Sequence, residues 1–168
     1  MRIVTSAVLV LVLSAATAFA AEKHSASINV SFDSDDPRTH VATRHTASEA
    51  RVVAATRNGA AVLMLLNDVI AVQLSDATVA EMKAKEDANF LEEWIVAGVR
   101  MALRKSVEYP IASIRSAELR DGVLVLTSVE GKPVFDEIKV NGSIVTRDLT
   151  PADAARFVNA FRAMKTRR

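Results

Sequence analysis

Four short turn signals divide the apolar part of this chain into strands. Each is a pair of turn-forming residues between apolar runs: Asn58-Gly59, Asn67-Asp68, Asp121-Gly122 and Asn141-Gly142. Asn-Gly and Asp-Gly pairs tolerate the positive φ angles of a tight primed turn, so they predict antiparallel hairpins. The chain is therefore expected to be rich in antiparallel sheet, whose strands such short turns can join.

The strands expected around these turns differ in how they are buried. Their ranges are 26–32, 51–56, 60–66, 69–74, 111–120, 123–129, 134–140 and 143–149. Polar and apolar residues alternate in 26–32, which is the period of a half-buried strand. The run 61–66 is apolar at every position, which favours a central strand covered on both faces.

Two helices are expected among these strands. Ser75 or Asp76 can cap the first, which has a charged part up to residue 87 and an apolar part over 90–103. Because a helix rarely continues through the residue before a proline, we expect it to end near Val107, ahead of Pro110.

Thr150 caps the second expected helix, with Pro151 in its first turn. The order is then strands, a long helix, strands and a C-terminal helix. This order predicts an α+β fold, in which an antiparallel sheet built from hairpins carries both helices.

The first twenty residues have the layout of a secretory signal peptide. Arg2 precedes an apolar run over 3–18, and the triplet Ala18-Phe19-Ala20 follows before the first carboxylate. We expect cleavage after Ala20, which leaves a single mature domain, 21–168, in a bacterial periplasm or outside the cell. The alternative is an uncleaved anchor, because the apolar run is nearly long enough to span a bilayer.

Composition excludes several classes of function. The chain has 21 Lys plus Arg against 20 Asp plus Glu, and loss of Arg2 makes the mature domain electrically balanced. Such a balance gives no general attraction to nucleic acid, and after cleavage no membrane span is expected. The chain has no cysteine, which rules out disulfides, thiol nucleophiles and thiolate metal sites. No cofactor is expected.

A polar segment without hydrophobic periodicity, 33–49, contains the main candidates for metal chemistry. His40 and His45 lie downstream of Asp33 and Asp35, and imidazole and carboxylate groups are ligands for zinc and similar ions. A metal-dependent hydrolase is one hypothesis for this set. The favoured interpretation is an irregular, solvated loop, because charged loops are usually that. No catalytic residue is predicted, since no nucleophile elbow or phosphate loop occurs.

The apolar part of the first helix offers the candidates for a ligand pocket. Phe90, Trp94 and Met101 lie on one side of that helix. Their helical spacing favours core residues packed on the sheet. The alternative is the wall of a pocket for a small apolar ligand between helix and sheet.

The leading functional hypothesis is an exported, non-catalytic binding or interaction domain. It would present a sheet edge to a protein partner or hold a small apolar ligand. One alternative is the metal-dependent hydrolase that uses the segment 33–49. The other is a self-associating envelope protein, because edge strands can pair with a second copy.

Overall fold

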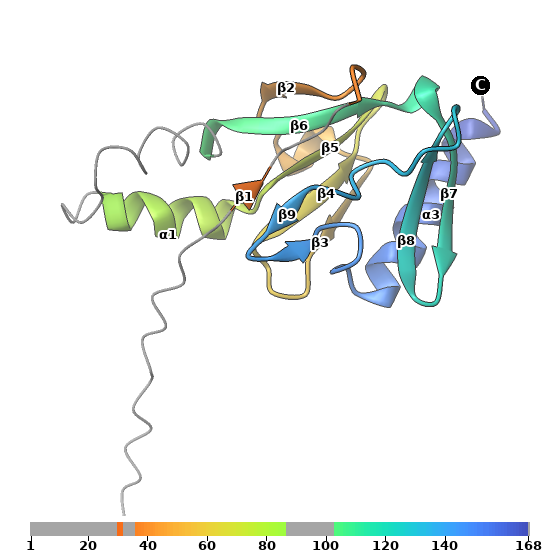
Figure 1. Ribbon diagram of the computed structural model, residues 1–168. Helices are drawn as coiled ribbons and strands as arrows, with labels where there is room; N and C mark the ends of the chain where they lie inside the picture. The colour runs from red at the N-terminus through yellow and green to blue at the C-terminus, as the bar shows by residue number, and fades with distance from the viewer. Residues whose placement is uncertain (1–29, 32–35, 87–102, 168) are drawn as a thin grey trace, which may run out of the picture.

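The structure is a computed structural model, and it describes residues 30–31, 36–86 and 103–167 (Figure 1). The strands are β1 (Val30–Ser31), β2 (His40–Thr43), β3 (Val52–Ala55), β4 (Ala61–Leu65), β5 (Val69–Leu74), β6 (Lys105–Pro110), β7 (Ile114–Arg120), β8 (Val123–Ser128), β9 (Lys139–Val140) and β10 (Ser143–Ile144). The helices are α1 (Asp76–Glu86) and α3 (Pro151–Lys165), and short 3-10 turns lie at Ala47–Glu49 and Ile111–Ser113. Within these ranges, no helix has the length and apolar character that a bilayer crossing requires.

These elements form an α+β fold, as the sequence predicts. The largest sheet is antiparallel with strand order β2-β6-β5-β4-β3, and two smaller sheets contain β1-β9-β10 and β7-β8. The hairpin turns lie where the turn signals stand. Both residues of Asp121-Gly122 and of Asn141-Gly142 have the positive φ angles of a primed turn, whereas at Asn58-Gly59 only Gly59 does, with a φ of 69°. Thr150 Oγ1 accepts the main-chain N–H of Asp153 at 3.1 Å and so caps α3.

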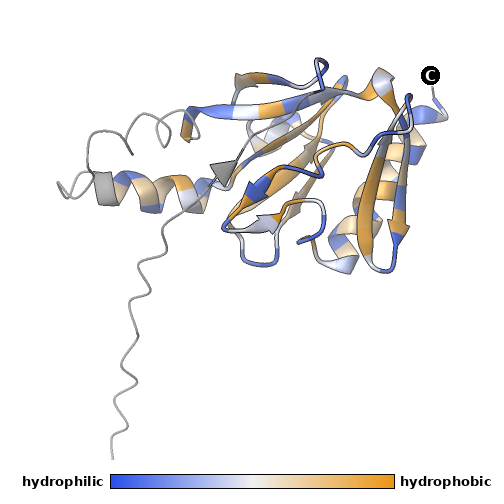
Figure 2. Cartoon of the chain, in the orientation of Figure 1, coloured by the Kyte–Doolittle hydropathy of each residue, from blue (hydrophilic) through white to orange (hydrophobic). Residues whose placement is uncertain are grey.

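The main hydrophobic core lies between one face of the five-stranded sheet, the β7–β8 hairpin and α3. From α3 it takes the buried residues Ala154, Phe157, Val158, Phe161 and Met164. In Figure 2 apolar colours run along the inner strands and along the β7–β8 hairpin, while hydrophilic colours mark the turns. Burial of these apolar side chains is the main favourable contribution to the folding free energy.

The opposite face of the sheet is crossed by residues 44–51, which we call the crossover segment. These residues join β2 at one edge of the sheet to β3 at the other, about 19 Å away at the usual strand spacing. The Gln73 side chain, on the central strand β5, binds the main chain of His45 through two 2.9 Å hydrogen bonds. Ala50 packs on a second, smaller apolar cluster of Met64, Leu66 and Ala71. The crossover segment therefore covers this face.

Strand β6 corrects the expected end of the first helix. The sequence predicted a helix up to Val107, but residues 105–110 form a strand inside the sheet. Val107 and Tyr109 enter the main core, while Glu108 lies opposite Ala71 on the crossover face. The side chains of β6 therefore alternate between the two faces of the sheet, with the two-residue period of a strand. This strand was missed because the apolar residues that precede it in the sequence favoured a continuing helix.

Parts of the polar segment 33–49, which was expected to be irregular, have regular structure. Residues 40–43 form β2, which pairs with β6 from Thr43 opposite Lys105 to His40 opposite Glu108. Three of the four residues of β2 are exposed, so the strand has no apolar alternation to reveal it. Of the expected strand 26–32, only Val30–Ser31 falls within the described ranges, where it pairs with β9.

Candidate functional site

The two histidines of the polar segment meet at one buried carboxylate, that of Glu108. His45 Nε2 lies 2.6 Å from Glu108 Oε1, and His40 Nε2 lies 3.2 Å from Oε2. The Glu108 side chain is only 8% exposed, whereas those of His40 and His45 are 52% and 23% exposed. His40 reaches the carboxylate because the two residues are direct cross-strand partners, whereas His45 reaches it from the crossover segment.

The Ser106 hydroxyl is a third hydrogen-bonding partner of the Glu108 carboxylate. Ser106 Oγ lies 3.1 Å from Glu108 Oε1 and also 3.1 Å from the carbonyl oxygen of Thr43. A buried carboxylate is costly unless hydrogen bonds or opposite charges offset the loss of water. Two imidazoles and a hydroxyl supply that compensation here. The cluster thereby joins β2, β6 and the crossover segment.

The second nitrogen of each imidazole also faces a protein oxygen. His40 Nδ1 lies 3.2 Å from the carbonyl oxygen of Arg38, and His45 Nδ1 lies 3.5 Å from Glu49 Oε2. A general base or a metal ligand needs a ring nitrogen whose lone pair is open to substrate or metal. Because all four nitrogens are turned to oxygens of the protein, the arrangement acts as an internal cross-link.

The predicted metal set is placed only in part. His40 and His45 come together, but Asp33 and Asp35 lie outside the described residues. In the part of the chain that the structure describes, no group of three or more His, Asp or Glu side chains is arranged to hold a metal ion. A metal site that includes the two aspartates stays a prediction.

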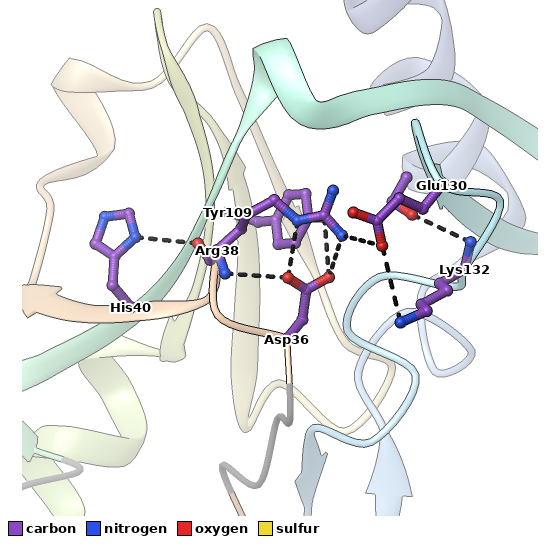
Figure 3. A network of polar contacts seen from close by, with 7 residues as sticks. Asp36, Arg38, His40, Tyr109, Glu130 and Lys132 are labelled. Atoms are coloured by element: carbon purple, nitrogen blue, oxygen red, sulfur yellow. Dashed lines mark hydrogen bonds and ion pairs between the residues drawn. The ribbon is translucent and has the colours of Figure 1, made fainter.

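A second polar network joins residues 36–38, just ahead of β2, to the sheet (Figure 3). Arg38 donates from Nε to Asp36 Oδ1 at 2.8 Å and from Nη2 to Oδ2 at 2.7 Å. The buried Tyr109 hydroxyl donates to Asp36 Oδ2 at 3.1 Å, and the Arg38 guanidinium lies over the Tyr109 ring. Arg38 Nη2 also lies 3.2 Å from Glu130, which Lys132 approaches at 3.8 Å.

Three ionisable groups in this network have shifted pKa values. The hydrogen bonds from Arg38 hold the pKa of Asp36 well below its usual range, and Asp36 in turn raises the pKa of Arg38. Burial raises the pKa of Tyr109, and its hydrogen bond to Asp36 adds to that effect. These shifts fix the charges of an ion pair, so the network anchors the chain ahead of β2.

Strands β2 and β7 each have one edge that no other strand of the described residues covers. Among the described residues, β2 pairs only with β6, and β7 pairs only with β8. Each strand carries an exposed apolar side chain: Val41 on β2 is 54% exposed and Leu119 on β7 is 41% exposed. Unpaired main-chain groups beside apolar side chains are the features that another strand can recognise.

Sequence reasoning missed the centre of both polar networks. Glu108 and Tyr109 were placed at the end of a helix or beyond it, so their roles were invisible. The alternation of Ser106 and Glu108 with Val107 and Tyr109 is the signal that points to a strand. The pocket candidates Phe90, Trp94 and Met101 lie outside the described residues.

Protein-family models, curated proteins and solved structures all yielded no match to the chain.

Proposed function

We propose that this protein is an exported, non-catalytic interaction domain that binds a segment of a partner protein along β2. The observation that carries the proposal is the edge position of β2 with Val41 exposed on it. A partner segment can add to such an edge through main-chain hydrogen bonds while an apolar side chain gives selectivity. Export is inferred from the signal-peptide layout of residues 1–20.

The contacts of His40 and His45 with Glu108 support the proposal, because they hold β2 in place. Glu108 ties β2 and the crossover segment to β6, and each ring nitrogen of His40 and His45 faces a protein oxygen. An edge strand that is held in place this way is preorganised, which lowers the entropic cost of binding a partner.

Site-specific photo-cross-linking in cells that express the full chain tests this proposal. A photo-reactive amino acid at Val41 is expected to form a discrete adduct with a partner protein. The matched control is Arg147, which is similarly exposed but lies away from β2. Adducts of the same size and yield from both positions, or none from Val41, would show that the β2 edge does not bind a partner.

The second candidate is a metal-dependent enzyme that uses His40 and His45. Zinc binding measured by equilibrium dialysis on the mature chain, 21–168, separates the two candidates. Under our proposal the chain retains no zinc, with or without the double substitution His40→Ala/His45→Ala. Stoichiometric zinc that is lost in the double variant would favour the enzyme.

A further inference from the structure

The outer edge of β7 is the longest open strand edge in the described part of the chain. Strand β7 has seven residues and pairs there only with β8. Figure 1 shows β7 at the rim of the molecule, next to α3 and on the side away from the five-stranded sheet. Its end at residues 118–120, beside the hairpin turn, offers main-chain donors and acceptors to another strand.

The tip of the hairpin determines which main-chain groups are free. Asp121 and Gly122, with φ angles of 51° and 78°, make the tight turn, and Arg120 and Val123 close it. Hydrogen-bonded and non-hydrogen-bonded pairs alternate along an antiparallel ladder. The pair that closes such a turn is hydrogen-bonded, so Leu119 turns its N–H and C=O away from β8.

The charged residues on either side of Leu119 have opposite signs, so this part of β7 is complementary in charge to a second, antiparallel copy of itself. Arg120 donates to Glu118 Oε2 from Nε at 3.0 Å and from Nη2 at 2.8 Å, and both side chains are exposed. The guanidinium also holds the pKa of Glu118 below its usual range, so that carboxylate is ionised at neutral pH. One strand therefore carries a negative and a positive charge on the same face, one residue either side of Leu119.

A two-fold axis through Leu119 uses these charges best. Antiparallel pairing with a second copy then places Leu119 opposite Leu119, and each Glu118 opposite the Arg120 of the other chain. An axis through Glu118 would place two carboxylates directly opposite each other, which is destabilising. An axis through Ala117 would leave Glu118 opposite Ser116 without a cation.

We propose that β7 binds a second copy of this chain by antiparallel pairing centred on Leu119. The two β7–β8 hairpins then join at their tips over residues 118–120, because the turn at Asp121 and Gly122 follows. Two complementary charge pairs lie on one face of this junction and the leucine pair on the other. This contact uses a different edge from β2. It goes beyond the proposed function, and either proposal can fail while the other stands.

A cysteine substitution tests the geometry directly, because the chain contains no other cysteine. Leu119→Cys in the mature chain, 21–168, is expected to form a disulfide-linked dimer under mild oxidation. Residues directly opposite each other in a sheet lie within the Cα separation of about 4.4–6.8 Å that a disulfide spans. The matched control is Val129→Cys, which is 45% exposed and lies after β8. Equal cross-linking of both variants, or none at position 119, overturns the proposal.

A charge swap tests the register. In sedimentation velocity at about 5 to 500 µM, a range suited to a contact smaller than a standard interface, we expect reversible dimerisation. Glu118→Arg alone and Arg120→Glu alone place like charges opposite each other and should weaken association at least tenfold. The double variant Glu118→Arg/Arg120→Glu restores complementarity and should return to within about threefold of the parent.

The matched control for the charge swap is Arg147→Glu, which reverses the charge in another exposed ion pair, with Asp136. It should leave association unchanged. A parent that stays monomeric throughout, or a double variant as weak as the single variants, overturns the proposal. Because Glu118 and Arg120 are exposed, these variants are expected to fold.

Discussion

Replacement of Glu108 by Gln isolates the contribution of the carboxylate on which both histidines converge. The substitution keeps the volume of the side chain but removes its charge and one of its two acceptor oxygens. In the parent, Oε1 receives His45 Nε2 and the Ser106 hydroxyl, and Oε2 receives His40 Nε2. In the glutamine, the amide oxygen can accept hydrogen bonds from the partners of only one of the two parent oxygens. The amide NH₂ group then faces the partners of the other oxygen.

The expected loss of stability follows from these contacts. A hydrogen bond to a charged group contributes about 1.5–3 kcal/mol, and a buried donor left without a partner adds to the cost. His40 is half exposed, so water can replace its lost partner, which places the loss near the lower part of that range. We therefore expect the free energy of unfolding to fall by about 2 kcal/mol.

Urea unfolding of the mature chain, followed by circular dichroism at pH 7, measures this loss. For a domain of this size the slope is about 2 kcal/mol/M, so the midpoint should fall by about 1 M with the slope unchanged. The matched control is Glu137→Gln, whose parent residue is exposed, and which should leave the midpoint within error. A midpoint for Glu108→Gln that matches this control would refute the inferred role of the carboxylate.

Three further predictions concern the core, a turn and the change in stability at acid pH. Phe157→Ala removes a fully buried ring from α3, so unfolding in urea should show a loss of about 3–5 kcal/mol, and a loss below about 1 kcal/mol contradicts the assigned core. Gly59→Ala meets no atom within 4 Å but must adopt a φ of 69°, which should cost about 1 kcal/mol by the same assay; no cost would mean that the turn is built differently. Because Arg38 depresses the pKa of Asp36, the ionised carboxylate stabilises the fold above the unfolded value of about 3.9, and this stabilisation is lost as the pH falls toward the folded pKa. Asp36→Asn should therefore destabilise most at pH 7 and progressively less from about pH 4 downward in denaturation at several pH values, whereas a constant difference would argue against the ion pair.

The sequence by itself determined the features whose cause lies within a few residues. The turns at Asn58-Gly59 and Asp121-Gly122 form hairpins because backbone angles at those pairs are decided locally. Thr150 and Pro151 start α3 for the same reason, since a cap depends on the first turn of the helix alone. From these signals the α+β class followed, whereas β2 and β6 were not predicted.

Only the tertiary structure decided which strands pair across the sheet and which side chains meet. His45 and Glu108 are 63 positions apart in the sequence, and they meet because β2 pairs with β6 while the crossover segment returns over the same face. Tyr109 receives its partner, Asp36, through the same pairing. Strand pairing of this kind depends on register and burial over the whole domain, which no local pattern encodes.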